Sequence, residues 1–219
     1  MCASYGLGSG GGTTLPNDLP PLSEQASKTL LEEWMRSRSG SAKITGRRAL
    51  NLNPIIRADA GGERSLELAW WWLWLDGSGP AKFSAFNSRD DKLLRSWKRQ
   101  FQHRALLPAT WYVEKKGRFQ LPGGEVFGIA AVTSTVTQED GTELVTYSMV
   151  TRDAPEDSEA AEYWPRMPLV LPRDQHDTWL DPERAGDETL VAEVQHASDE
   201  ISRALTTGAP LVSVDSTLF

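Results

Sequence analysis

The sequence EVFGIAAVTSTVTQEDGTELVTYSMVT, residues 125–151, contains two stretches rich in β-branched and aromatic residues. Such side chains favour extended structure, so we predict strands over 125–137 and 143–151. The Asp140-Gly141 pair between the two stretches is typical of a tight β-hairpin turn. This segment therefore predicts an antiparallel hairpin.

Further elements are predicted on both sides of this hairpin. Lys116-Gly117 marks a second hairpin turn, and Ser23 is a candidate N-cap for the first helix. Strands are predicted over 66–75, 105–114 and 169–171, and helices over 23–37, 90–101 and 185–206. No repeat or linker divides the chain. We therefore predict an α+β fold and a single domain over 1–219, with a curved, mainly antiparallel, barrel-like sheet, flanking short helices, and a C-terminal helix and final strand in 183–219.

The composition is that of an ordinary globular protein, with 219 residues, 39% hydrophobic and 24% charged. No apolar run reaches the roughly 18 residues of a membrane-spanning helix, and no signal peptide is evident. The one cysteine cannot form an internal disulfide, which fits a reducing compartment. We expect a monomer in the cytoplasm that has no contact with membranes and is associated with the nucleoid when bound to DNA.

The charge is unevenly distributed along the chain. The net charge is -7, yet residues 82–118 contain ten basic and three acidic residues, a local charge of +7. Such a patch suits a polyanion, although a solvated helix face would have the same composition. Nine tryptophans are present, four of them within 70–74. Tryptophans can pack in a core or stack on unpaired bases, and both interpretations stay open.

Cys2 has a chemical option that an internal cysteine lacks. Removal of Met1 would give Cys2 a free α-amine beside its thiol, with ordinary pKa values of about 8 and about 8.5. An amine condenses with an aldehyde to an imine, and the adjacent thiol can close a five-membered thiazolidine ring. The alternative is that Cys2 follows the start residue by chance.

Other common sites are not indicated. The glycine-rich stretch 6–12 lacks a preceding strand and the lysine of a phosphate-binding loop, so we predict a plain loop. His103, His176 and His196 belong to no metal-ligand spacing or Ser-His-Asp signature, and we expect them at the surface or in structural positions. We expect no metal and no cofactor.

Four segments carry a family resemblance: Met1-Cys2, 86–89 (FNSR), 107–114 (LPATWYVE) and 165–168 (PRMP). In this order and at about this spacing they resemble the SRAP family, the SOS response-associated peptidases or abasic-site processing proteins. The resemblance extends from residue 1 to about 182. It implies a DNA-damage enzyme that removes its own initiator methionine, binds single-stranded DNA at abasic sites, and forms a covalent thiazolidine with the sugar aldehyde.

The resemblance also implies roles for individual residues. Cys2 would be the nucleophile, Asn87 would hold the α-amine or sugar oxygens, and Glu114 would be the general acid/base. Trp164 stands where the family has a catalytic histidine, which puts any step that needs that histidine in doubt. Ala3-Ser4 replaces the family's Gly-Arg. The expected DNA-binding residues are Arg89, Trp70, Arg104 and Arg166.

Two alternatives remain from the sequence. A degenerate family member would bind single-stranded DNA without forming a covalent product, and its binding would depend on salt. A cysteine peptidase or amidohydrolase would act on other substrates and turn over small amides without DNA.

Overall fold

The computed structural model describes residues 2–8 and 21–207. Five strands close into a barrel: β3 (Leu52–Ala58), β4 (Arg64–Trp71), β6 (Arg104–Ala109), β9 (Phe127–Thr137) and β10 (Glu143–Asp153). Four of the five neighbouring pairs are antiparallel, and the ring closes through the parallel pairing of β4 with β10. The predicted α+β fold with a curved, mainly antiparallel sheet is confirmed, and so is the 125–151 hairpin.

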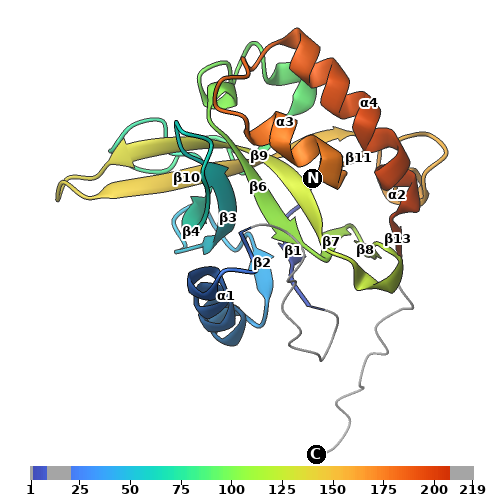
Figure 1. The fold of residues 1–219 in the computed structure, drawn as a ribbon, viewed down its shortest axis with the longest axis horizontal. Coiled ribbons are helices and arrows are strands. Elements are labelled where there is room, and N and C mark those ends of the chain that lie inside the picture. Colours follow the sequence, from blue (N-terminus) through green and yellow to red (C-terminus); the bar gives the residue numbers. More distant parts are fainter. Residues whose placement is uncertain (1, 9–20, 208–219) are drawn as a thin grey trace, which may run out of the picture.

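A second sheet lies beside the barrel (Figure 1). It is antiparallel, in the order β13 (Thr206–Thr207), β8 (Gly117–Gln120), β7 (Trp111–Glu114), β1 (Ser4–Gly6) and β2 (Ser41–Lys43). The predicted strand over 105–114 is therefore two strands, β6 and β7, in different sheets. The break falls at Thr110, whose backbone N–H donates to the carbonyl of Gly6 at 2.8 Å. Gly6 has no room for a side chain, because a Cβ there would lie 2.1 Å from the Gly40 oxygen.

Short strands and helices surround the two sheets. Strands β5 (Asn87–Arg89) and β11 (Arg166–Pro168) pair with β10, and β12 (Val170–Leu171) pairs with β9. The helices are α1 (Gln25–Arg38), α2 (Glu159–Tyr163), α3 (His176–Leu180) and α4 (Glu188–Ala204). Figure 1 shows α2, α3 and α4 gathered on one side, with α1 on the other.

Two local predictions were wrong. The basic segment 90–101 is not one helix but two 3₁₀ turns, Asp90–Lys92 and Gln100–Gln102, joined by further turns. Its start has no side-chain cap, and Leu94, predicted to face inward, is 38% exposed. Helix α1 begins after Glu24 rather than Ser23 and has no side-chain cap bond. Helix α4, by contrast, starts at a bonded cap, in which Asp187 accepts from the Leu190 N–H at 2.9 Å.

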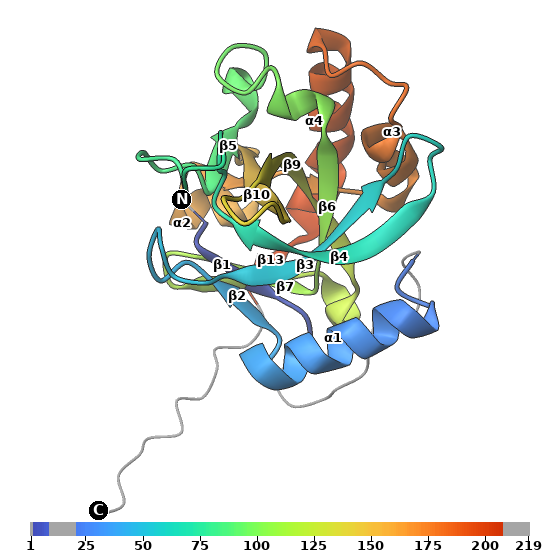
Figure 2. The same ribbon diagram turned by 90° about the vertical axis from the view of Figure 1, so that its left-hand side faces the viewer.

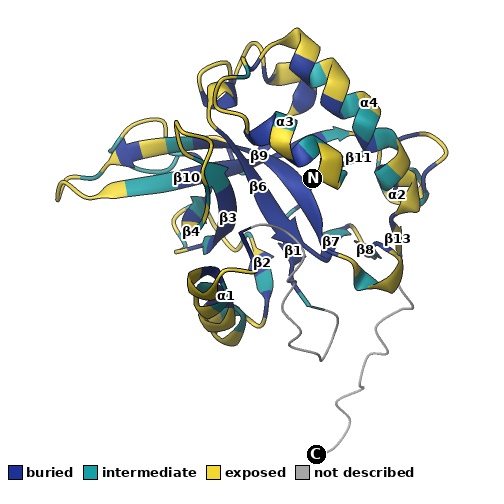
Figure 3. Cartoon of the chain, viewed as in Figure 1, coloured by how far each residue is buried: buried dark blue, intermediate teal, exposed yellow. Residues whose placement is uncertain are grey.

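Most tryptophans belong to the core. Trp34, Trp71, Trp72, Trp97, Trp111 and Trp179 are buried. Barrel strands β6 and β9 are buried along much of their length, as Figure 3 shows. Within the described ranges, no helix is both long and apolar enough to cross a membrane. The predicted loop over 6–12 falls largely outside the described residues.

Candidate active site

Cys2 lies just before β1 and is fixed against β7. Only 1% of its surface is exposed. Its Sγ is 3.4 Å from the carbonyl oxygens of both Ser4 and Val113, weak hydrogen bonds in which the thiol donates. Because β1 is held between β2 and β7, the position of Cys2 is set by backbone pairing on both sides of the strand.

Burial, with a smaller contribution from the nearby Glu114, raises the pKa of the Cys2 thiol to about 12. The thiol is therefore protonated near neutral pH while Met1 is in place, when the Cys2 nitrogen is an amide. A neutral thiol is a weak nucleophile. In this state the cysteine is held in position but is not activated.

Asn87 reaches Cys2 from the barrel. Its Nδ2 donates to the backbone carbonyl of Cys2 at 2.7 Å, although the two residues are 85 positions apart. The side chain is buried, and β5 holds it through parallel pairing with β10. Its Oδ1 is buried and has no hydrogen-bond partner among the described residues. Asn87 therefore has an acceptor available beside the Cys2 backbone.

Glu114 is the last residue of β7 and is 4% exposed. The register Ser4↔Val113 places it next to Ala3, one residue from Cys2. Cys2, Asn87 and Glu114, which the sequence predicted as the catalytic set, are thus brought together.

Tyr112 is a member of this region that the sequence analysis missed. It lies two residues before Glu114, so both side chains point to the same face of β7. Its hydroxyl is buried, without a hydrogen-bond partner in the described part of the chain. Burial raises the pKa of Tyr112 well above 10, and the nearby Cys2 and Glu114 raise it further. The two-residue period from Glu114 was the only sequence signal for this neutral donor.

Trp164, at the position expected for a histidine, packs on a lysine. The Nζ of Lys115 lies 3.7 Å from the centroid of the Trp164 ring, a cation–π contact. Lys115 follows Glu114 directly and has a positive φ of 55°, which is uncommon outside glycine. The turn between β7 and β8 therefore presents an ammonium group beside the Glu114 end of the site.

Two of the expected DNA-binding arginines lie around Asn87 and are paired with acids. Arg89 is half exposed and donates to both carboxylate oxygens of Asp91, at 2.8 and 2.9 Å. Arg166 is mostly buried, and its guanidinium donates to Asp153 at 2.7 Å and to Asp90 at 3.1 Å. Arg89 is thus the more accessible of the two.

Arg104 is not at the site. It is 7% exposed, and its guanidinium donates to the carbonyls of Phe101, Trp179, Asp181 and Arg184. These bonds tie the segment after α3 to the barrel. The expectation that Arg104 contacts DNA was drawn from the basic cluster, and we assign Arg104 a structural role instead.

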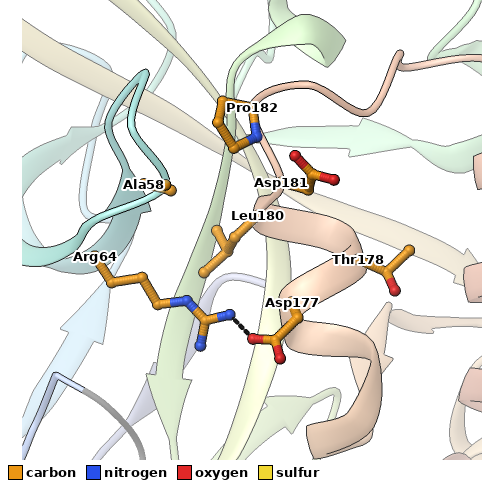
Figure 4. Close-up of a pocket in the computed structure, with 8 residues that line it drawn as sticks. Ala58, Arg64, Asp177, Thr178, Leu180, Asp181 and Pro182 are labelled. Carbon is orange, nitrogen blue, oxygen red and sulfur yellow. Dashed lines mark hydrogen bonds and ion pairs between the residues drawn. The ribbon is translucent and has the colours of Figure 1, made fainter.

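His176 is held in a structural position, and a hollow lies beside α3. His176 is buried, and its Nε2 lies 3.1 Å from the Leu171 carbonyl, while burial lowers its pKa to about 4. A hollow of about 420 Å³ lies beside α3, and Figure 4 shows Arg64 paired with Asp177 in it. None of the predicted site residues lines it. No group of three or more potential metal ligands occurs in residues 2–8 and 21–207.

Comparisons with known proteins identify a matching family and structures with a similar fold. A family described as SOS response associated peptidase (SRAP) matches residues 28–207. Two crystal structures of Bordetella bronchiseptica proteins, one of them phage-related, are similar at TM-scores of 0.58 and 0.54, and one from Bacteroides thetaiotaomicron at 0.60. Each is 16% identical to the chain, and the alignments cover 90%, 94% and 88% of this chain and 92%, 92% and 86% of theirs, in the same order.

These structures share the fold, and at that identity they show nothing more. No curated protein matches the sequence. The family that matches is associated with DNA binding and with the DNA damage response. Because the match covers most of its length, the chain belongs to the SRAP family.

Proposed function

We propose that the protein processes abasic sites: it binds single-stranded DNA and, after Met1 is removed, links Cys2 covalently to the sugar aldehyde. The observation that carries this proposal is the 2.7 Å bond from Asn87 Nδ2 to the Cys2 carbonyl, beside the buried Glu114. It ties the backbone of Cys2 to a side chain 85 positions away, beside the glutamate that we propose as the acid/base group.

The proposed reaction begins at the ring-opened sugar. The α-amine nitrogen of Cys2 adds to the aldehyde carbon, and the resulting carbinolamine loses water to give an imine. The Cys2 Sγ then adds to the imine carbon while a proton goes to the nitrogen, which closes the thiazolidine ring. One water is released in all, and no redox partner is needed. Glu114 would move the protons, as a carboxylate when it accepts and as an acid when it donates.

Removal of Met1 also changes the electrostatics of the site. The amide nitrogen of Cys2 becomes an amine that can carry a positive charge. A positive charge next to the thiol favours the thiolate and so opposes the rise in pKa caused by burial and Glu114. We expect the buried Asn87 Oδ1, which has no hydrogen-bond partner among the described residues, to accept a hydrogen bond from this amine. We therefore expect methionine removal to be the activating step.

A non-catalytic DNA-binding protein is the second candidate. Its supporting observation is Trp164, which packs on Lys115 and cannot transfer protons as a histidine does. The buried, protonated Cys2 thiol agrees with it as well. Such a protein would still bind single-stranded DNA, but it would form no covalent product.

The test starts with the intact mass of the purified protein, which reports whether Met1 is absent. The processed protein is then mixed with a single-stranded oligonucleotide that contains one abasic site, and adducts are resolved on a denaturing gel. We expect a stable adduct with the wild type and none with Cys2→Ala. A processed wild type that forms no adduct, or a Cys2→Ala variant that forms the same one, would contradict the proposal. Cys2→Ser is the matched control, because it keeps a polar side chain of nearly the same size but cannot close the sulfur ring.

A further inference from the structure

Tyr112 lies in the middle strand of the second sheet and is closed off from solvent. Figure 2 shows β7 next to β1, and β8 pairs with its other edge. Tyr112 is directly opposite Tyr5 on β1 and Phe119 on β8. Its ring stacks on that of Phe119, with centroids 5.0 Å apart at an interplanar angle of 15°. Two backbone pairings and one stacked ring therefore fix the position of this side chain.

The neighbouring Tyr5 shows how a buried phenol is normally accommodated. The hydroxyls of Tyr5 and Tyr147 are 2.6 Å apart and share a hydrogen bond. The Tyr112 hydroxyl is buried as well, but it has no partner among the residues that the structure describes. A buried donor of this kind is unfavourable and rare in native proteins, unless another state of the protein supplies its acceptor. That acceptor has to come from within the protein, because almost no surface of the hydroxyl is open to a ligand.

Three ionisable side chains lie close enough to affect this hydroxyl. Burial, with smaller contributions from Cys2, Glu114 and Glu159, raises the pKa of Tyr112 well above 10. Glu159, on α2, is engaged elsewhere, since its carboxylate accepts from the Thr207 N–H at 3.1 Å and from the Thr207 hydroxyl. Of the other two side chains, Cys2 contributes more to the raised pKa.

Cys2 changes its hydrogen-bonding character when it ionises. As a thiol it donates to the carbonyls of Ser4 and Val113, each at 3.4 Å. A thiolate has no proton to donate, so both carbonyl oxygens would then face a negative charge. The anion needs a donor instead, and Tyr112, adjacent to Val113 on β7, has one available. Its raised pKa keeps the phenol protonated near neutral pH.

We propose that the Tyr112 hydroxyl donates a hydrogen bond to the Cys2 thiolate and holds the sulfur for ring closure. The identity of the carbon that the sulfur attacks rests on the proposed function, but the hydrogen bond itself does not. In this step the thiol proton passes to Glu114, and a lone pair of Sγ forms the bond to the imine carbon. The imine nitrogen takes up the electron pair of the double bond together with a proton from Glu114, while Tyr112 keeps its own proton. The product sulfur is a thioether, a weak acceptor, so the hydrogen bond stabilises the thiolate more than the product.

Tyr112→Phe removes the hydroxyl and keeps the stacked ring. The protein is taken after removal of Met1, which intact mass verifies, and the rate of Cys2 alkylation by iodoacetamide is measured across pH. We expect the midpoint of the pH profile to rise by about one unit or more in Tyr112→Phe, because a hydrogen bond to an ionised group stabilises it about tenfold or more. At a fixed pH below both midpoints the rate should fall about threefold, since a more basic thiolate is also more reactive.

The matched control is Tyr5→Phe, which removes a buried hydroxyl from the directly opposite residue, where it is bonded to Tyr147. The midpoint of this variant should equal that of the wild type. Urea denaturation should separate the two variants in the opposite sense. Tyr112→Phe should be at least as stable as the wild type, because it removes an unpaired buried hydroxyl, whereas Tyr5→Phe should be less stable, because it leaves the Tyr147 hydroxyl unpaired.

An unchanged midpoint in Tyr112→Phe, or an equal rise in Tyr5→Phe, overturns the hydrogen bond. A loss of stability in Tyr112→Phe also overturns it, since the hydroxyl would then be bonded already while Cys2 is a thiol. A wild-type midpoint combined with slower adduct formation on abasic DNA would assign the hydroxyl to Glu114 and contradict the proposal as well. A raised midpoint in Tyr112→Phe alone supports the bond, and it does so even if no adduct with abasic DNA forms, in which case only the proposed function fails.

Discussion

The Cys2 site and a cavity of about 650 Å³ that is lined by Trp70, one of the expected DNA-binding residues, are built in opposite ways. Cys2, Asn87 and Glu114 are each exposed by less than a tenth and are held at or beside paired strands. The cavity is lined mainly from loops, apart from Trp70 in β4, with an exposed Lys82 and a half-exposed Phe83. Paired backbone fixes atoms to within the tolerance that bond formation needs, whereas loops can adapt to a flexible strand. From this comparison we infer that the Cys2 site carries out the chemistry and that the cavity binds the strand.

The largest expected effect is on the reactivity of the buried Cys2 thiol, and it tests how closed the Cys2 site is. With Met1 present, its pKa of about 12 leaves about a thousandfold less thiolate near pH 8 than an ordinary cysteine has. Alkylation by iodoacetamide, followed by mass spectrometry, should be slower by about that factor in the folded protein than in urea. The rate should rise about tenfold per pH unit as pH approaches 12. Fast labelling of the folded, Met1-containing protein at neutral pH would show that the site is open.

The same pKa predicts how folding depends on pH. Because the folded pKa lies above the value of 9.0 for a free thiol, the folded state keeps a proton that the unfolded state loses. This contribution to the free energy of unfolding is complete below about pH 9 and is lost as pH rises toward 12. Cys2→Ala should remove this part of the decline. Equal pH profiles for the variant and the wild type would contradict it.

A smaller effect, still large, is expected at Glu114. If Glu114 moves protons, Glu114→Gln in the processed protein should slow adduct formation about a hundredfold, since general acid/base groups contribute on that scale. Binding of an undamaged strand should not change, because the carboxylate is buried away from the cavity. Quench-flow or timed gel assays give the rate, and Glu125→Gln, an exposed glutamate, is the control. If Glu114→Gln weakened strand binding as much as it slowed adduct formation, the two regions would not have separate functions.

Asn87 should have a more moderate effect. Asn87→Ala removes the donor to the Cys2 carbonyl, and a buried hydrogen bond of this kind contributes about 1 kcal/mol or somewhat more to stability. Asn87→Asp should be worse than alanine, because a carboxylate would face the carbonyl oxygen. Urea denaturation measures the free energy of unfolding, and the adduct rate should fall about tenfold in both variants. Full stability in Asn87→Asp would show that the hydrogen bond does not anchor Cys2.

Some features of the structure could be predicted from the sequence, and others could not. The 125–151 hairpin was predictable because strand propensity and the Asp140-Gly141 turn are local signals. The break at Thr110 was not, because it depends on a bond to Gly6, 104 residues away. Arg104 was expected to contact DNA, yet it is buried, and its guanidinium donates to the nearby Phe101 carbonyl and to three carbonyls of the distant segment 179–184. The motifs identified Cys2, Asn87 and Glu114, while the Lys115–Trp164 contact depends on packing that no local pattern reveals.

The smallest expected effect tests the boundary between the two regions. Lys115 and Lys116 are adjacent, exposed and equally charged, but only Lys115 lies over the Trp164 ring. A cation–π contact at an exposed site contributes about 0.5–1 kcal/mol, so Lys115→Met should slow adduct formation a few-fold while Lys116→Met leaves it unchanged. Trp164→Leu should match Lys115→Met, and the double variant should lose no more than either single change, because both remove one contact. If Lys115→Met and Lys116→Met weaken strand binding equally and leave the adduct rate alone, the turn serves general attraction to the phosphates. If only Lys115→Met acts, and on the rate alone, then the ammonium belongs to the Cys2 site, and the ring at position 164 serves to position it.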